Sequence, residues 1–183
     1  MQRRDALAGM MGLLASAGAS AVRAAVPAQS AADDFVRGEL AAAKAEGKTL
    51  ALYFHASWCS YCKLFDMFLA DPKAAPIFNA RFRLARMRVR EEKAKYKAQQ
   101  LTGVEQVFGR FSPGNIAVPL MVFLNPDGSA RAKSLNDKGK NIGFPVADWE
   151  LDWFEIMLSR AAPDMSANDI AALRNVCVRI YKK

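Results

Sequence analysis

The sequence predicts an α/β protein in which a mixed sheet is flanked by helices. Segments of helical periodicity alternate with short apolar runs rich in strand-forming residues, and this alternation is typical of α/β layers. The turn sequence Asn125–Gly128 joins two strand-like runs, so we expect one antiparallel pair. The 183 residues are 52% hydrophobic and 24% charged, the balance of a globular protein that builds its own core.

The first segment, residues 1–24, predicts an export signal rather than folded structure. Arg3 and Arg4 precede an uncharged run rich in Ala, Gly and Ser at residues 6–22, and both Ala19-Ser20-Ala21 and Val22-Arg23-Ala24 suit a processing site. The arginine pair before a weakly hydrophobic run is similar to twin-arginine signals. The run is too weakly apolar to anchor the chain well, so we expect cleavage and no stable membrane insertion. A retained anchor and a plain N-terminal tail are the alternatives.

The composition narrows the classes of function. Three cysteines are too few for a disulfide scaffold, and one histidine excludes a metal site built from several histidines. The net charge is +8, and the chain stays basic without the signal, which carries three arginines and one aspartate. An exported protein rarely meets nucleic acid, so we assign this charge to solubility or to attraction of anionic partners and expect no nucleic-acid binding.

The N-terminal half begins with a small polar linker at residues 25–32. A helix is predicted over 33–46, with two aspartates at its start and Gly47 at its end. The apolar run 49–54 follows and predicts a buried strand. After a break of a few residues, the pattern over 63–70 turns helical again.

The middle of the chain adds a short helix, a strand and a polar helical region. Asp71-Pro72 is expected to cap the short helix, and Pro76 to shorten or bend it. Alternating apolar residues and arginines then predict a strand over 81–90, which we expect to be central in the sheet. Residues 91–111 are expected to be mostly helical, with a break at Thr102-Gly103.

The remaining strands form a hairpin, and two helices follow it. Strands are predicted at 120–124 and 129–135. The last two helices are predicted over 148–161 and 166–181, and each carries an apolar stripe. We expect the two tryptophans of the first of them, Trp149 and Trp153, to lie in the core.

These elements suggest one main domain over residues 33–161. The segment 162–183 adds an extra C-terminal helix that is expected to pack on this domain. Its single cysteine, Cys177, falls on the apolar stripe, so we interpret it as a small buried hydrophobe. A third redox thiol or a bridge between two copies are the alternatives for Cys177.

The motif with the clearest chemistry is Cys59-Ser60-Tyr61-Cys62. Two intervening residues at a helix start bring the two sulfurs close enough to bond. The first sulfur then lies over the exposed N–H groups of the first turn, which stabilise a thiolate and lower its pKa from about 8.5 to roughly 3.5–7.5. The thiolate is the nucleophile in disulfide exchange. An apolar strand before the motif and an amphipathic helix after it strengthen this interpretation.

With these residues in place, the chain resembles the thioredoxin superfamily. The matching segments are LALYFHASWCSYCK at 50–63, ARMRVRE at 85–91 and AVPLMVFLNPDG at 117–128. The resemblance covers roughly residues 33–160 and implies a thioredoxin fold. The Trp-Cys-x-x-Cys motif with a downstream Val-Pro before a strand is specific for the fold, but it does not identify one branch of the superfamily.

The resemblance also implies roles for individual residues. Cys59 would be the attacking thiol and Cys62 the resolving thiol. Pro119 would follow a cis peptide bond and pack against the sulfurs, which is a specific expectation because only about 5–6% of X–Pro bonds in folded proteins are cis. Val118 would offer its backbone groups to a substrate peptide, and Trp58 would line the same substrate-binding surface.

The function that follows is thiol–disulfide exchange in the periplasm. We expect the protein to reduce disulfides in exported client proteins, with no cofactor and no metal. A membrane thiol electron donor is implied, because something must restore the dithiol. The same atoms serve oxidation equally well, and only the reduction potential decides the direction.

The chain departs from thioredoxins proper at three places. Tyr53 stands where they carry a buried carboxylate, so the usual proton acceptor beneath the disulfide is missing. Arg86 stands where a lysine often partners that carboxylate. Ser60-Tyr61 replaces Gly-Pro, and a tyrosine at the second position is closer to exported disulfide reductases and isomerases.

Two residues are hypothesised to tune the attacking thiol. His55 precedes Cys59 by four residues, and an imidazolium there would lower the pKa of the thiol. The alternative is that His55 is an ordinary hydrogen-bonded or half-exposed histidine with no effect on the thiol. Arg86 is hypothesised to approach the cysteine helix near Tyr53, whereas the alternative for the arginines of its strand is pairing with acids such as Glu91.

Three other interpretations of the cysteine motif stay open. Cys59 and Cys62 could form a structural disulfide that locks a loop in a non-catalytic interaction module. They could bind a metal, and with His55 they could hold Cu(I) in a copper chaperone. Related copper sites usually have a wider cysteine spacing and a distant histidine, and this chain has neither.

Overall fold

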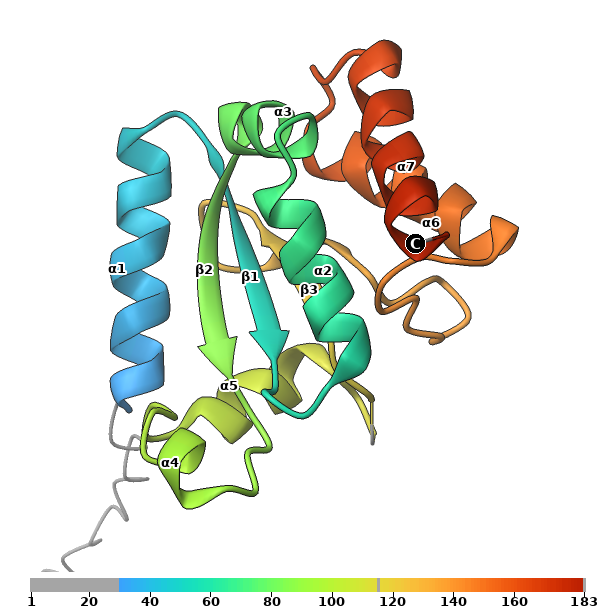
Figure 1. Cartoon of the computed structure of the whole chain (residues 1–183). Coiled ribbons are helices and arrows are strands. Elements are labelled where there is room, and N and C mark those ends of the chain that lie inside the picture. The colour runs from blue at the N-terminus through green and yellow to red at the C-terminus, as the bar shows by residue number, and fades with distance from the viewer. Residues whose placement is uncertain (1–29, 115, 183) are drawn as a thin grey trace, which may run out of the picture.

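A mixed four-stranded sheet forms the centre of the computed structural model, which describes residues 30–114 and 116–182 (Figure 1). The strand order is β2-β1-β3-β4, with β2 parallel and β3 antiparallel to β1, and β4 antiparallel to β3. The strands are β1 (Thr49–His55), β2 (Phe82–Arg88), β3 (Leu120–Leu124) and β4 (Ala130–Lys133). The export signal predicted for residues 1–24 lies outside the described residues.

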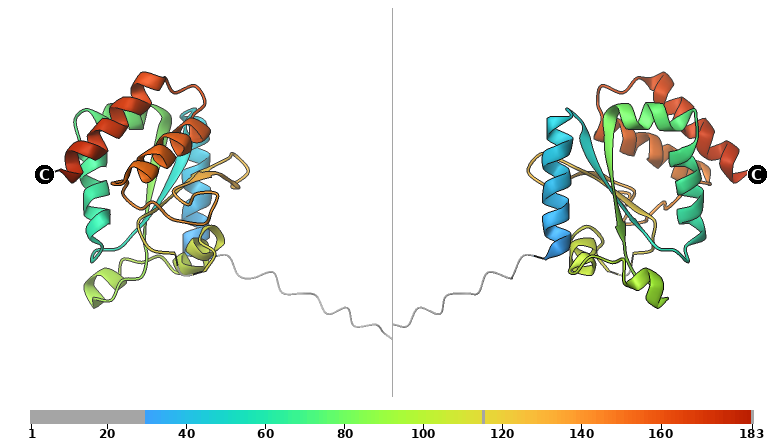
Figure 2. Two further views of the ribbon diagram at one scale, coloured as in Figure 1. Left: turned by 90° about the vertical axis from the view of Figure 1, so that its right-hand side faces the viewer. Right: turned by 60° about the vertical axis from the view of Figure 1, so that its left-hand side comes forward.

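Helices cover both faces of this sheet. On one face α1 and α5 pack against the strands, and on the other lie α2, α3, α6 and α7 (Figures 1 and 2). The helices are α1 (Ala31–Ala45), α2 (Ser60–Ala70), α3 (Ala74–Arg81), α4 (Ala94–Lys97), α5 (Val104–Phe111), α6 (Asp148–Ala161) and α7 (Ala167–Tyr181). The predicted α/β architecture with a mixed sheet is therefore confirmed. None of the helices in these described ranges is long and apolar enough to cross a bilayer.

Helix α1 begins earlier than the sequence predicts. Ser30 caps it, because its hydroxyl accepts from the Asp33 N–H at 3.2 Å while the Asp33 carboxylate accepts from the Ser30 N–H at 3.3 Å. The prediction took Asp33 for the start of the helix and placed Ala32 in the linker. That boundary is wrong, since Ala32 belongs to the helix and is fully buried.

Two expectations for the α3–β2 region are also wrong. Pro76 neither shortens nor bends α3, because it lies in the first turn, where a missing N–H leaves no hydrogen bond unmade. Strand β2 lies at an edge of the sheet and not at its centre. The edge position explains why a strand with so many arginines is tolerated there.

The arginines of β2 tie helices on both faces to this edge. Arg83 pairs with Glu46 and, at 2.7 Å, with Glu39, and both acids belong to the α1 side. Arg86 points to the opposite face and pairs with Asp66 of α2 at 2.5 Å. Because successive side chains of a strand point to opposite faces, the ion pairs of β2 are divided between the two helical layers.

The core between the sheet and the four-helix face is aromatic. Phe68 packs edge-to-face against both Phe78 and Phe154, at ring-centroid distances of 6.2 and 5.7 Å. Helix α7 closes this core with four buried side chains: Leu173, Val176, Cys177 and Ile180. The interpretation of Cys177 as a buried hydrophobe agrees with its position, since it is 1% exposed and forms no disulfide.

Neither tryptophan of α6 is buried in that core, although Trp153 packs against it. Trp149 is 45% exposed and Trp153 is half-buried, with its indole N–H donating to the Lys133 carbonyl at 3.1 Å. The expectation that both are core residues is wrong. The buried positions of α6 are Leu151, Phe154, Met157, Leu158 and Ala161, and with about 100° per residue Trp149 lies roughly opposite this stripe and Trp153 at its side.

Candidate active site around Cys59 and Cys62

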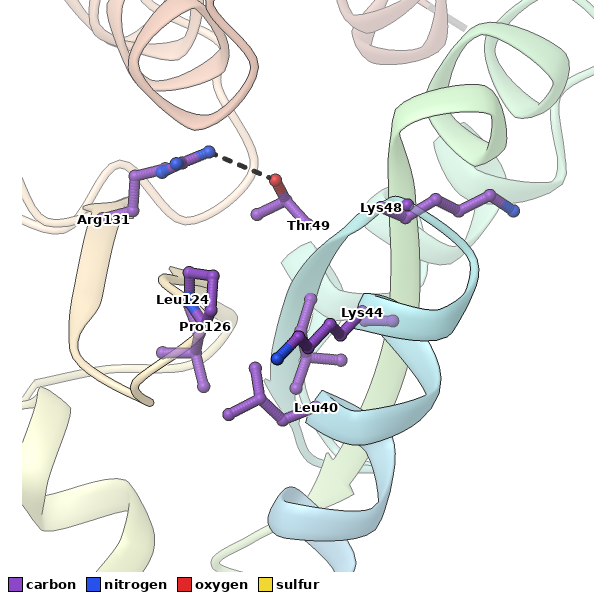
Figure 3. Close-up of a pocket in the computed structure, with 10 residues that line it drawn as sticks. Leu40, Lys44, Lys48, Thr49, Leu124, Pro126 and Arg131 are labelled. Carbon is purple, nitrogen blue, oxygen red and sulfur yellow. Dashed lines mark hydrogen bonds between the residues drawn. The ribbon is translucent and has the colours of Figure 1, made fainter.

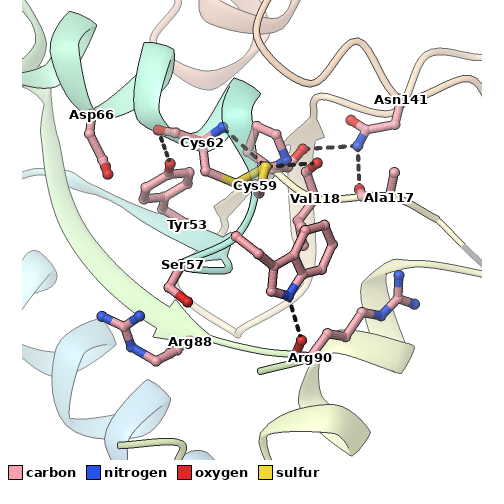
Figure 4. The surroundings of a disulfide bond; sticks show 12 residues. Tyr53, Ser57, Cys59, Cys62, Asp66, Arg88, Arg90, Ala117, Val118 and Asn141 are labelled. Atoms are coloured by element: carbon pink, nitrogen blue, oxygen red, sulfur yellow. Dashed lines mark hydrogen bonds between the residues drawn. A yellow bond between two sulfur atoms is a disulfide. The ribbon is translucent and has the colours of Figure 1, made fainter. Parts of the chain in front are cut away.

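The junction between β1 and α2 positions the two cysteines. Cys59 is the N-cap residue of α2, and its Sγ accepts a hydrogen bond from the Cys62 N–H at 3.1 Å. The two residues form a disulfide, with Cα atoms 5.2 Å apart (Figure 4). The helix start therefore directs an N–H donor at the first sulfur, which is the arrangement that stabilises a thiolate once the disulfide is reduced.

The disulfide is nearly covered, but exposed aromatic residues adjoin it. Cys59 is 5% and Cys62 2% exposed, whereas Trp58 is 51% and Tyr61 43% exposed. A cavity of about 230 Å³ lies next to Tyr61 and extends along Val118 and Pro119. This cavity therefore adjoins Val118, whose carbonyl contacts the Cys59 sulfur.

The loop before β3 brings backbone groups to the sulfurs. The Val118–Pro119 peptide bond is cis, which is the geometry that the resemblance implies. The Val118 carbonyl oxygen lies 3.4 Å from the Cys59 Sγ, where it can accept a hydrogen bond from the thiol in the reduced protein. Within the described residues, the Val118 N–H has no hydrogen-bond partner. In the described part of the chain, this backbone unit is therefore held at its carbonyl alone, by the Cys59 sulfur.

Tyr53 lies beneath the disulfide in place of a carboxylate. Its hydroxyl donates to the Cys62 carbonyl at 3.0 Å, and burial raises the pKa of the phenol far above its usual value. A phenol that stays protonated cannot accept a proton from Cys62 near neutral pH. Arg86 lies where the hypothesis places it, with its guanidinium carbon 5.3 Å from the Tyr53 ring centroid, but its charge is paired with Asp66.

His55 lies at the end of β1, stacked on the Tyr53 ring with centroids 5.1 Å apart. Burial lowers the pKa of the imidazole below its ordinary value of 6.5, and the positive charge of Arg88 lowers it further. The ring is therefore neutral at neutral pH. A neutral ring stacked on Tyr53 gives no support to the hypothesis that an imidazolium tunes Cys59.

Comparison with known proteins decides the family. A family model described as thioredoxin-like matches residues 31–126, more than half of the chain. The chain belongs to the thioredoxin-like family. On this fold, a Cys-x-x-Cys pair that forms a disulfide at a helix start makes the protein a thiol–disulfide oxidoreductase.

Three solved structures are similar to parts of this chain. A disulphide isomerase from Xylella fastidiosa Temecula1 is 20% identical, with 88% of this chain and 99% of that one covered and a TM-score of 0.47. A thioredoxin from Thermus thermophilus is 23% identical over 69% of this chain and 86% of that one, with a TM-score of 0.41. A protein titled DsbH oxidoreductase is 17% identical over 52% and 65%, with a TM-score of 0.40. No curated protein matches the sequence closely enough to count as a relative.

Glu91 binds the loop just before the Cys-x-x-Cys motif, a contact that the sequence did not predict. Its buried carboxylate accepts from the Ser57 N–H at 2.7 Å, from the Ser57 hydroxyl at 2.6 Å and from Arg88 at 2.8 Å. Burial by itself would raise the pKa of Glu91, but the hydrogen bonds from Ser57 and Arg88 outweigh it and lower the pKa. The pairing with arginine was an expected alternative, whereas the contact with Ser57, two residues before Cys59, had no sequence signal.

Arg90 was missed as a site residue, although it connects three segments around the disulfide. It has a left-handed backbone with φ of +54°, and its carbonyl accepts from the Trp58 indole N–H at 2.7 Å (Figure 4). Its guanidinium donates to the Ile116 carbonyl at 2.6 Å and lies over the Phe108 ring. Arg90 therefore fixes Trp58 relative to the loop that leads into Val118.

Other cavities lie away from the cysteines. The pocket in Figure 3, of about 250 Å³, is lined by Leu40, Lys44 and Arg131 and opens beside Thr49, at the opposite end of β1. In the described part of the chain, no three His, Cys, Asp or Glu side chains gather as metal ligands would. His55 is stacked on Tyr53, so the geometry gives no support to the copper-site alternative.

Proposed function

We propose that the protein is a periplasmic oxidoreductase that reduces disulfides in exported client proteins. The single observation that carries this proposal is the position of the Cys59 sulfur. It caps α2, accepts the Cys62 N–H and lies 3.4 Å from the carbonyl of Val118, whose N–H has no partner among the described residues. One sulfur thus combines a stabilised thiolate with an adjacent surface on which a peptide can bind.

The first step is attack by the Cys59 thiolate on a client disulfide. A bond forms between Cys59 and one client sulfur while the client S–S bond breaks. The second client sulfur leaves as a thiolate and takes up a proton. In the second step Cys62, after losing its proton, attacks the Cys59 sulfur, re-forms the Cys59–Cys62 disulfide and releases the client as a dithiol. The Cys59–client bond breaks in this second step, so two electrons pass from the enzyme to the client, which takes up two protons, one balanced by Cys62 and one from solvent.

The direction and the location rest on sequence features. Tyr61 is the second residue between the two cysteines, and a tyrosine at that position is similar to the motifs of exported reductases and isomerases. This similarity supports reduction as the direction. The signal predicted at residues 1–24 supports export to the periplasm, where disulfides form and persist. A membrane thiol donor would then restore the dithiol after each turnover.

Trapping tests the chemistry. In a Cys62→Ala variant the second step is blocked, so mixed disulfides with clients should accumulate on Cys59 in a periplasmic extract. A Cys59→Ala variant is the matched control and should trap none, and Cys177→Ala should trap as the parent does. Adducts that form only on Cys177 would contradict the proposal.

The reduction potential tests the direction. A potential near that of thioredoxin, about −270 mV, supports a reductant, whereas one near −120 mV, roughly that of a strong oxidant, overturns it. A difference of about 30 mV corresponds to 1.4 kcal/mol for this two-electron couple, so equilibration with glutathione resolves the two cases.

A further inference from the structure

Asn141, in the segment between β4 and α6, holds the loop that contains Pro119. Its side-chain NH₂ donates to the carbonyl of Ala117 at 2.7 Å and to that of Pro119 at 2.9 Å (Figure 4). These carbonyls flank Val118 on either side. One carboxamide therefore binds both neighbours of the residue that faces the Cys59 sulfur.

The orientation of the Asn141 side chain is fixed by a second set of contacts. Its oxygen accepts from the Ser134 hydroxyl at 2.8 Å and from the Gly143 N–H at 3.2 Å. The buried Ser134 hydroxyl accepts in turn from the Met121 N–H at 3.0 Å. The carboxamide thus uses both donors and both acceptor positions, and exchanging its nitrogen and oxygen would break all four bonds.

This network selects which backbone groups stay free. Asn141 occupies the carbonyls of Ala117 and Pro119, so the Val118 unit between them keeps its own carbonyl toward Cys59. Its N–H has no partner in the described ranges. An extended peptide pairs with such a unit through its own N–H and C=O groups, as in strand addition. Asn141 also lines the cavity beside Tyr61, together with Ile142 and Gly143.

We propose that Asn141 is a positioning residue that makes the enzyme prefer disulfides carried on a polypeptide over small disulfides without a peptide backbone. The inference rests on the proposed disulfide exchange and names the group that sets its substrate class. Asn141 itself does not touch the exchanging sulfurs. It holds Val118 in the orientation that pairs with the client main chain.

The test compares two substrates of the reduced protein. One is a protein disulfide, as in insulin, and the other is bis(hydroxyethyl) disulfide, which offers no peptide groups. In Asn141→Ala the ratio of the two rate constants should fall by about fivefold or more, the effect of weakening one or two backbone hydrogen bonds. The matched control is Asn125→Ala, in the turn between β3 and β4, and it should leave the ratio unchanged.

The ratio also separates this role from a merely structural one. Partial unfolding of Asn141→Ala removes active enzyme and lowers both rates equally, so it does not change the ratio. The milder Asn141→Ser variant, which keeps one donor, should give an intermediate ratio. A ratio within about twofold of the parent in both variants would overturn the inference. A parent protein that reduces neither substrate would instead refute the proposed exchange, and the inference with it.

Discussion

Single residues set the environment of the disulfide, and Tyr53 is the clearest example. Its hydroxyl reaches the carbonyl of Cys62 from beneath the helix start. The side chain is completely buried, stacks between His55 and Phe65 and lies under the guanidinium of Arg86. In this position a neutral phenol contributes a hydrogen bond and packing, where a carboxylate would contribute a proton acceptor.

The Tyr53→Phe variant separates these roles. Loss of the hydrogen bond should cost about 1 kcal/mol of unfolding free energy. Thermal denaturation should show a decrease of about 2–4 °C in the melting temperature. The exposed Tyr181→Phe is the control and should melt like the parent. Disulfide exchange should persist, and a loss of about a hundredfold, the size of a general-base contribution, would contradict a structural role for Tyr53.

Glu91 acts at the same scale on the loop before Cys59. The hydrogen bonds from Ser57 and Arg88 are made to the ionised carboxylate, so protonation weakens them. Because the pKa of Glu91 is lower in the folded protein than its ordinary value of 4.5, its contribution to stability is present above that value. It is lost as the pH falls through the folded pKa.

The Glu91→Gln variant should therefore change the pH dependence of stability. Denaturant unfolding from about pH 7 to pH 3 should show that the parent loses more stability in acid than the variant does. Other carboxyls with lowered pKa values contribute equally to both proteins, so the difference between the curves reports Glu91. Glu92→Gln, at an exposed neighbour, should follow the parent curve. Parallel curves for the parent and Glu91→Gln would contradict the prediction.

At the scale of elements, the position of each cysteine in the secondary structure sets its reactivity. Two of the three lie at the β1–α2 junction and the third lies in α7. Cys59 caps α2, Cys62 lies in its first turn and Cys177 is enclosed by α7 and its neighbours. Burial raises the pKa of the Cys177 thiol well above its ordinary value. The secondary structure, rather than the residue type, therefore sets the order of reactivity.

Limited alkylation of the reduced protein should show that order. Iodoacetamide should modify Cys59 first and Cys177 last, and the Cys59 rate should persist below about pH 8.5, the ordinary thiol value. Peptide mapping by mass spectrometry measures the modified fractions. In denaturant the three rates should become equal. Modification of Cys62 before Cys59 would refute the assignment of the attacking thiol.

Elements defined by local patterns could be predicted from the sequence. Strand β1, the cysteine helix and the β3–β4 hairpin all have their signals within a dozen residues. The edge position of β2 and the support from Glu91, Arg90 and Asn141 could not be predicted. They depend on which segments meet in space, and a single asparagine in a polar loop has no local pattern that separates it from a turn residue.

At the scale of the whole molecule, α7 completes the core. It packs against α2, α3 and α6, so the last helix supports the helix that carries the cysteines. Leu173 is fully buried among these elements. Stability of the exchange site therefore depends on residues more than a hundred positions away in the chain.

The Leu173→Ala variant measures that dependence. We expect a loss of about 2–5 kcal/mol, as for other large-to-small changes in a packed core. Denaturant unfolding gives the value, and Ile156→Ala, at a side chain that is 41% exposed, should cost much less. Equal effects of the two substitutions would show that α7 does not share the main core.

The position of β2 at the edge of the sheet has a consequence for aggregation. An unpaired strand edge is a template on which other chains can add strands and aggregate. Arg83, Arg86 and Arg88 line this edge in ion pairs with carboxylates of neighbouring segments, and charged side chains on an edge strand oppose strand addition. This edge is thereby made a poor starting point for fibre growth.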